Sequence, residues 1–194
     1  MSEYFTSHDD ILENKLGITD PQVLKQIEDE IVPVRTAEIY SSFPVKAFDF
    51  DMLRKIHFIM FSDLYQMAGQ VRNVDMVRGD NRIPFCFTQN IDQEQRRIFG
   101  ILNQENDFVG LDREAFVKKI AWLSSELNAL HPFRDGNGRA IRAFLVLLAA
   151  HAGFELDYSK VDKDELIEAD VRAFLGDVSS LEEVYSQSIL IQKQ

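Results

Sequence analysis

The segment that most constrains the fold runs from residue 131 to residue 150, where a glycine-containing loop passes directly into an apolar run. Residues 131–142 read HPFRDGNGRAIR, and residues 143–150 read AFLVLLAA. A helix with so few polar positions is stable in water only when neighbouring elements cover it on most sides. We therefore expect the chain to build its core around this helix, with the loop held at the helix N-terminus.

The loop has the composition of an anion-binding site. A glycine loop that enters a helix leaves backbone N–H groups without intrahelical partners, and the helix dipole favours negative charge there. Arg139 and Arg142 are three residues apart, so they share one helix face. Because arginines on an otherwise apolar helix are costly unless paired, a phosphate site is favoured over a solvated helix face.

The other polar residues of the loop each have a functional and a structural interpretation. The ordinary pKa of a histidine lies near neutral, which makes His131 suitable as a general base towards a hydroxyl. Asp135 either forms only a turn or supplies the hard carboxylate oxygen that Mg²⁺ takes beside phosphate. Asn137 can donate its amide to a phosphate oxygen, whereas Gly136 and Gly138 either serve a tight turn or let phosphate reach the backbone.

Three more residues, one of them far from the loop in sequence, have mainly structural interpretations. Phe133 is expected to anchor the loop in the core, although it is also counted with the nucleotide site below. His57 lies near the apolar stripe of a predicted helix and is expected to be a satisfied core or boundary histidine. His151, at the end of the apolar helix, is expected to complement the helix dipole.

Composition limits the partners of the chain. A net charge of −11 argues against a protein that neutralises many nucleic-acid phosphates, although a nucleotide needs only a local positive site. Cys86 is the single cysteine, which excludes a disulfide framework and multi-cysteine zinc sites. The chain has no apolar run of membrane-spanning length, and its first ten residues are too acidic for a Sec leader. We therefore expect a cytoplasmic protein with no membrane or nucleic-acid partner; delivery by another secretion route is an open alternative.

Helical patterns dominate the sequence and predict a mainly α fold, with six to eight helices around the central apolar helix. We expect one domain over residues 1–194, with a core of about residues 11–190. Asp20 followed by Pro21 predicts a helix start, and Pro33 is expected to disturb that helix. Further helix starts are predicted at Asp49 or Asp51, at Asn90 with Gln93, at Asp112, at Asp162 with Glu165, and at Ser179 with Glu182.

A different pattern occupies residues 71–87. Two short runs of β-branched and apolar residues flank Gly79, Asp80 and Asn81, which predicts a small hairpin. Pro84 removes a ladder donor, so at least one edge of this hairpin is expected to be exposed.

The loop and helix together resemble the signature of the Fic family, HxFx(D/E)GNGRxxR. Every specified position is filled, by His131, Phe133, Asp135, Gly136, Asn137, Gly138, Arg139 and Arg142. The resemblance extends over roughly residues 11–190 and includes residues 53–80, which are similar to the helix and flap region of Fic domains. It implies the Fic fold, with the hairpin as a flap, and an enzyme that transfers AMP from ATP to a Tyr, Ser or Thr hydroxyl of a target protein, with release of pyrophosphate.

The resemblance also implies roles for the motif residues. His131 acts as the general base and Asp135 holds Mg²⁺ on the α- and β-phosphates. Asn137 positions the α-phosphate, Gly136, Gly138 and nearby amides cradle phosphate, and Arg139 and Arg142 bind the outer phosphates. Catalytic function is thereby assigned to His131, Asn137, Arg139 and Arg142, and nucleotide binding to Phe133, Gly136, Asn137, Gly138, Arg139 and Arg142.

Partners follow from the same resemblance. The flap, with contacts at Ile83, Pro84 and Phe85, is expected to bind an extended target segment by strand addition. Fic domains are often inhibited by a helix bearing (S/T)xxxE(G/N), whose glutamate pairs with the second motif arginine. Ser179 and Glu183 have that spacing, but Val184 follows where Gly or Asn is expected. The chain therefore resembles Fic proteins without a built-in inhibitory helix.

Fic proteins of that kind are commonly toxins that a small separate antitoxin inhibits. We therefore expect such a partner, a role as toxin or effector, and a homodimer as an open alternative. Two other functions remain alternatives to AMP transfer. One is a Doc-like kinase, which binds the nucleotide reversed, and the other is a silent nucleotide-binding interaction module.

Overall fold

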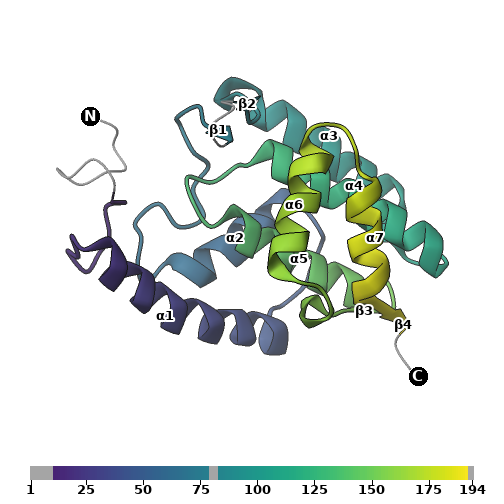
Figure 1. Ribbon diagram of the computed structural model, residues 1–194, viewed down its shortest axis with the longest axis horizontal. Coiled ribbons are helices and arrows are strands. Elements are labelled where there is room, and N and C mark those ends of the chain that lie inside the picture. Colours follow the sequence, from purple (N-terminus) through teal and green to yellow (C-terminus); the bar gives the residue numbers. More distant parts are fainter. Residues whose placement is uncertain (1–10, 79–82, 192–194) are drawn as a thin grey trace.

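The computed structural model describes residues 11–78 and 83–191, and this part of the chain is mainly helical (Figure 1). Its helices are α1 (Pro21–Ser42), α2 (Phe50–Phe61), α3 (Ile91–Gln104), α4 (Arg113–Leu130), α5 (Asn137–His151), α6 (Lys163–Phe174) and α7 (Ser179–Ser188). Its strands are β1 (Val77–Arg78), β2 (Ile83–Pro84), β3 (Phe154–Leu156) and β4 (Ile189–Ile191). Single turns of 3-10 helix lie at Thr88–Asn90, Asn106–Phe108 and Tyr158–Lys160. The predicted fold class is confirmed.

Helix α5 is the central element that the apolar run predicted. It packs against α1, α2, α4 and β3 (Figure 1). Phe144, Leu145 and Leu148 are fully buried on it, and burial of such side chains stabilises the fold by about 1.5–3 kcal/mol each. The motif loop therefore enters a helix that the rest of the molecule holds in place.

Several helix starts lie where the caps predicted them. The Asp20 carboxylate accepts hydrogen bonds from the N–H groups of Gln22 and Val23, and Pro21 occupies the first helical position. Asp49 caps α2, Asp112 caps α4 and Asp162 caps α6, each by accepting from a backbone N–H of the first turn. Such caps satisfy donors that the helix itself leaves unpaired.

Three local predictions were wrong. Helix α1 continues through Pro33 to Ser42, because Pro33 is exposed and the unpaired carbonyl one turn earlier faces solvent. Helix α3 does begin after Asn90, as predicted, but the Asn90 side chain makes no capping bond, because the residue also ends a 3-10 turn. Ser179 is the first helical residue of α7, and its hydroxyl donates to Asp177 instead of capping the helix.

The predicted hairpin is present but short. Strands β1 and β2 are antiparallel, with Val77 opposite Pro84 and Arg78 opposite Ile83. Its predicted turn, residues 79–81, lies outside the described residues. A second antiparallel pair, β3 with β4, joins the end of the central helix to the C-terminal segment, and the sequence reading missed it.

Candidate active site

The motif loop connects the C-terminus of α4 to the N-terminus of α5. Helix α4 ends at Leu130, and His131 follows in the left-handed conformation with φ 45° and ψ 59°. Helix α5 begins at Asn137, and its first intrahelical bond runs from Ala140 N–H to the Gly136 carbonyl. The N–H groups of residues 137–139 are therefore the donors that the helix leaves free at this end.

Gly136 is required by its conformation and by its neighbours. Its φ is +74°, and a Cβ there would lie 2.5 and 2.6 Å from two ring carbons of Phe61. It would also lie 3.2 Å from Nε2 of His57. The tight-turn interpretation thus accounts for this glycine, whereas a Cβ at Gly138 would meet only the mobile end of Arg142, 3.3 Å away.

The side chain of Asn137 closes the loop. Its Oδ1 accepts from the Phe133 N–H at 2.9 Å, and its Nδ2 donates to the Phe133 carbonyl at 2.8 Å. The side chain is buried. The sequence predicted a phosphate contact for this amide. In the structure both of its polar atoms bond to the Phe133 backbone, a role that the sequence did not predict.

Counting Phe133 with the nucleotide site was wrong, because its side chain is 0% exposed and cannot contact a ligand. Its ring stacks on the ring of His57, with centroids 4.0 Å apart. Phe133 therefore anchors the loop in the core, as its structural interpretation expected.

His57 holds the motif loop through a hydrogen bond to its backbone. Its Nδ1 accepts from the Gly69 N–H at 2.9 Å, and its Nε2 lies 2.8 Å from the Asp135 carbonyl. Because Nδ1 accepts, the neutral ring carries its proton on Nε2 and donates to that carbonyl. Burial lowers the pKa of His57 to about 4. The prediction of a satisfied core histidine is confirmed.

His131 has a base-like environment. Burial lowers its pKa to about 4, and the positive charge of Arg72 acts in the same direction. The ring is therefore neutral at pH 7, which is the state that a general base needs. Its Nδ1 is buried, and an interaction of the ring with the Asn128 backbone partly opposes the lowering of the pKa. Phe85 covers one face of the ring, with centroids 3.8 Å apart.

Arg72 is a site residue that the sequence reading missed. Its guanidinium is buried and donates to backbone carbonyls of three segments. Nε donates to the His131 carbonyl at 2.7 Å, Nη1 to Val74 at 2.8 Å, and Nη2 to Cys86 and, at 3.4 Å, to Leu130. Arg72 thereby ties the flap to the end of α4. The sequence gives no signal for this role of Arg72, because its hydrogen-bond acceptors are backbone carbonyls, which every residue has.

The two motif arginines have different partners. Nη1 of Arg139 contacts the carboxylate of Glu28 on α1 at 2.8 Å, and Nη2 lies 3.5 Å from Asp135. The Arg139 guanidinium also lies over the Phe61 ring, 4.6 Å from its centroid. Arg142 forms no hydrogen bond or ion pair with the residues that the structure describes. Its positive charge acts at longer range on the Asp170 carboxyl of α6.

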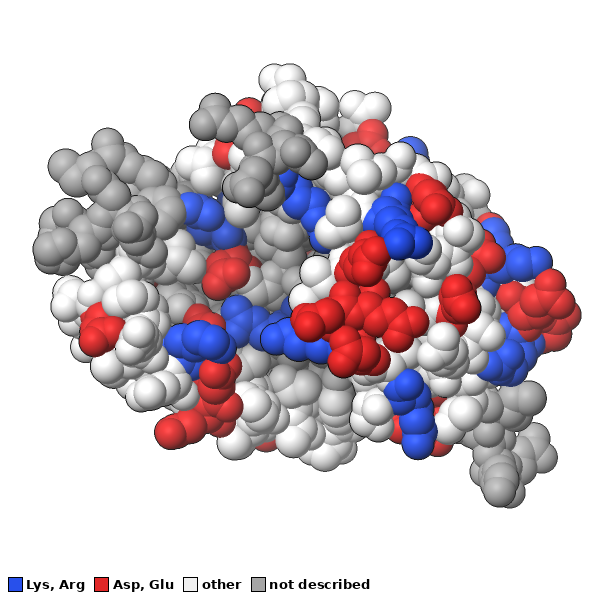
Figure 2. Space-filling view, viewed as in Figure 1, with Lys and Arg blue, Asp and Glu red and all other residues white. Residues whose placement is uncertain are grey.

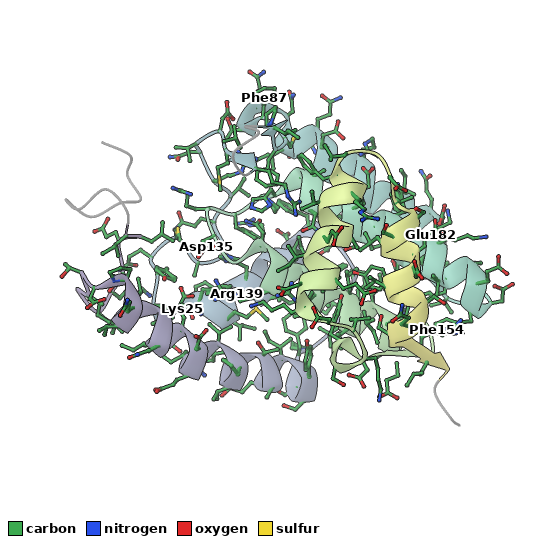
Figure 3. All side chains as sticks on the ribbon, in the orientation of Figure 1. Lys25, Phe87, Asp135, Arg139, Phe154 and Glu182 are labelled. Atoms are coloured by element: carbon green, nitrogen blue, oxygen red, sulfur yellow. The ribbon has the colours of Figure 1, made fainter. Side chains whose placement is uncertain are left out.

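Both arginines and the two carboxylates beside Arg139 line a pocket of about 460 Å³ between α1 and the motif loop. Figure 3 shows Lys25, Asp135 and Arg139 close together beside α1, and all three line the pocket. In Figure 2, blue side chains gather near the middle of this face, next to red ones over α6 and α7. The complete lining is Ile11, Leu12, Pro21, Leu24, Lys25, Glu28, Asp29, Tyr65, Asp135, Arg139, Arg142 and Lys163. Its four cations, which come from α1, α5 and α6, outnumber its three carboxylates, so the pocket suits an anion.

Asp135 fits the metal role that the sequence assigned. Its side chain is 49% exposed, and it borders the pocket. No group of three His, Cys, Asp or Glu residues that could hold a metal occurs in the described ranges. A single carboxylate is what Mg²⁺ uses when substrate phosphates and water supply its other ligands. The donor set therefore fits magnesium bound together with a nucleotide.

The three predicted flap contacts lie in different environments. Ile83 is half-buried and Pro84 is exposed. Phe85 is buried against His131 and packs edge-on to Phe174 of α6. The Phe85 side chain therefore covers the His131 ring, and of the three residues only Pro84 is exposed.

Glu183 does not reach the motif. It lies on α7 in a separate recess with Arg172 and Ser180, whereas Arg142 lines the pocket between α1 and the motif loop. No described helix is both long and apolar enough to cross a membrane.

Comparisons with known proteins agree with this site. The family model described as Fic/DOC family matches residues 47–149. The probable protein adenylyltransferase Fic of Escherichia coli is 35% identical over 180 residues, which cover 93% of this chain and 88% of that protein. The BepC effector of Bartonella tribocorum, solved with bound AMPPNP, has a TM-score of 0.89 and 27% identity, and the match covers 98% of this chain and 97% of that one. An N-terminal Fic domain from Bartonella quintana with bound ADP gives a TM-score of 0.93 at 26% identity, covering 98% and 95%. The chain belongs to the Fic/DOC family.

Proposed function

We propose that this protein is a protein adenylyltransferase, which transfers AMP from Mg-ATP to a Tyr, Ser or Thr hydroxyl of a target protein. The observation that carries the proposal is a neutral, partly buried His131 on the same loop that borders the cation-lined pocket. The relatives named as adenylyltransferases and the solved relatives with AMPPNP or ADP support it.

The proposed step transfers one group and one proton. The target hydroxyl oxygen forms a bond to the α-phosphorus of ATP, the bond to the bridging oxygen breaks, and pyrophosphate leaves. His131 takes the hydroxyl proton on Nε2, because Nδ1 faces the interior. The free N–H groups at the start of α5 would meet the charge that develops on the phosphoryl oxygens.

The remaining motif residues bind and orient. Arg142, which has no ion pair within the described ranges, would meet an outer phosphate. Asp135 would hold Mg²⁺, whose charge would offset that of the α- and β-phosphates when bound. Asn137 would keep the loop closed, so that the N–H groups beside it stay aligned.

The hairpin supports target binding at one edge. The Phe85 N–H donates to the Met76 carbonyl, so Phe85 points its backbone groups towards β1. In an antiparallel pair these groups alternate along a strand, so Pro84 and Val77 point outwards. Pro84 has no N–H, whereas Val77 offers both a donor and an acceptor. We infer that a target strand adds beside β1 at Val77.

The regulatory proposal is a separate inhibitory protein. Arg142 carries no ion pair within the described residues, and Glu183 lies in another recess, so the second arginine is open to a carboxylate from a partner. An enzyme without such a partner is expected to harm its host, as a toxin or a delivered effector does. Growth with this chain expressed alone, compared with His131→Ala, tests this proposal, and equal growth would remove it. Self-association and a place in the bacterial cytoplasm stay predictions.

The central experiment follows the transferred phosphate. Purified protein is incubated with Mg²⁺ and a bacterial lysate, with ATP labelled at the α-phosphate in one sample and at the γ-phosphate in another. Label from the α position alone, lost in His131→Ala, supports AMP transfer. Label from the γ position alone would establish a Doc-like kinase instead. ATP binding without transfer of either label would indicate a silent binding module.

A further inference from the structure

The carboxylate of Glu28 enters the nucleotide pocket from α1, far in sequence from the motif. Glu28 lies two turns into α1, whose start is fixed by the Asp20 cap. Its side chain is 13% exposed, although it belongs to a surface helix. It shares the pocket with Asp135, Arg139 and Arg142 (Figure 3 labels the first two).

Glu28 has two partners, and both hold it in place. One oxygen accepts from Arg139 Nη1 at 2.8 Å, and the other accepts from the Tyr65 hydroxyl. Tyr65 is itself buried. The carboxylate therefore cannot leave Arg139 without also giving up a hydrogen bond in a partly desolvated place, which is costly.

This contact leaves the two motif arginines unequal. Arg139 is neutralised by Glu28, contacts Asp135 and rests on the Phe61 ring. Arg142 has no ion pair in the part of the chain that the structure describes. A nucleotide that enters the pocket meets one available guanidinium and one that is already occupied by a carboxylate of this chain.

We propose that Glu28 is a specificity-determining residue that competes with the outer phosphates of the nucleotide for Arg139. The inference rests on the proposed function, which places those phosphates at the motif arginines. ATP must displace the Glu28 carboxylate from Arg139, or bind beside it against its negative charge. Glu28 thereby lowers the affinity of the pocket for nucleotides according to how many phosphates reach Arg139.

The size of the effect follows from the fraction of molecules in which Arg139 is free. When a binding-competent state is one tenth populated, the apparent affinity falls about tenfold. The same coupling acts in both directions, so bound ATP also loosens the contact between Glu28 and Arg139. AMP, which has no outer phosphate, escapes this competition.

Glu28→Gln tests the proposal by calorimetric titration of the purified chain with Mg-ATP, Mg-ADP and AMP. We expect ATP to bind about tenfold more tightly than to wild type, ADP to gain less, and AMP to change by less than about twofold. Tyr65→Phe removes one of the two bonds that hold the carboxylate and keeps the packed ring. It is expected to tighten ATP binding about two- to threefold, and it serves if Glu28→Gln does not fold.

Glu30→Gln is the matched control. Glu30 lies two residues after Glu28 on α1, is exposed, and does not belong to the pocket lining. The variant makes the same chemical change and the same change in net charge, and we expect it to alter ATP affinity by less than about twofold. Equal effects of Glu28→Gln and Glu30→Gln would mean that only net charge matters, and would overturn the inference.

The outcomes separate this inference from the proposed function. Weaker ATP binding by Glu28→Gln would mean that Glu28 positions Arg139 for the nucleotide, and would also overturn the competition. If the wild-type protein binds ATP, Arg142→Ala does not, and Glu28→Gln binds ATP with wild-type affinity, only the inference fails. If neither wild type nor Glu28→Gln binds ATP, the proposed function fails with it.

Discussion

The ring of Phe85 lies flat against the ring of His131, with centroids 3.8 Å apart and planes within 15°. Phe85 follows β2 of the flap, and His131 ends α4. The flap therefore does more than border the site, because one of its side chains buries the His131 ring. Burial is the main cause of the low pKa of His131.

Removing the Phe85 ring is expected to raise the pKa of His131. In Phe85→Ala water reaches the imidazole, so its pKa moves from about 4 towards its ordinary value of 6.5. The acid limb of AMP transfer then moves to higher pH, because the base must be neutral. NMR titration of the His131 ring and initial rates between pH 4 and 8 measure both effects. Phe85→Leu keeps an apolar side chain over the ring, so the His131 pKa should rise less in this variant. Identical His131 titrations in wild type and both variants would contradict this account.

His57 is expected to make stability depend on pH. Its pKa is about 4 in the folded protein and near 6.5 when unfolded, so the unfolded chain binds more protons between those values. The free energy of unfolding therefore falls as pH drops from about 6.5 to 4, by up to about 3 kcal/mol from this group. Urea unfolding at pH 7 and pH 4.5 measures the loss. In His57→Gln the difference should shrink, because this group no longer titrates, while the contribution of His131 stays the same in both proteins.

The two motif glycines are expected to differ in their tolerance of a methyl group. Gly136→Ala forces a side chain into a left-handed residue against the buried Phe61 ring, and should cost more than about 3 kcal/mol. Gly138→Ala meets only the end of Arg142 and should change stability by less than about 1 kcal/mol. Thermal unfolding of the two variants measures the contrast, and similar melting temperatures would show that the loop adapts.

Arg72→Lys is expected to loosen the flap although it keeps the charge. An ammonium group cannot reproduce the planar set of bonds to the carbonyls of His131, Val74 and Cys86. We expect a loss of about 3 kcal/mol in stability. Hydrogen exchange should accelerate at the Cys86 amide, which donates to Ala129. Unchanged exchange there would mean that the flap is held without Arg72.

The sequence predicted best what local chemistry determines. Asp20, Asp112 and Asp162 cap helices because each lies beside the N–H groups that it satisfies. The central helix was predictable because an apolar run of that length has to be buried. The motif predicted His131 on the loop and both arginines at the start of the helix that follows it, and the structure has them there.

The sequence predicted less well what distant segments determine. Glu28 and Arg139 are 111 residues apart, and Arg72 bonds to carbonyls that have no residue signature. Asn90 occupies the N-cap position of α3, but it also ends a 3-10 turn, and its side chain makes no capping bond. Pro33 looked like a helix end, yet solvent accommodates the missing bond on its exposed side.

Arg72 also has a consequence for genetics. Its guanidinium donates to backbone carbonyls of the flap and of the end of α4, and it is buried away from any substrate. A screen that selects inactive alleles should therefore recover changes at position 72 alongside those at His131. The two classes would differ in the amount of protein in the cell. Alleles at position 72 lower protein abundance through unfolding, whereas His131→Ala is expected to leave a normal amount of inactive protein.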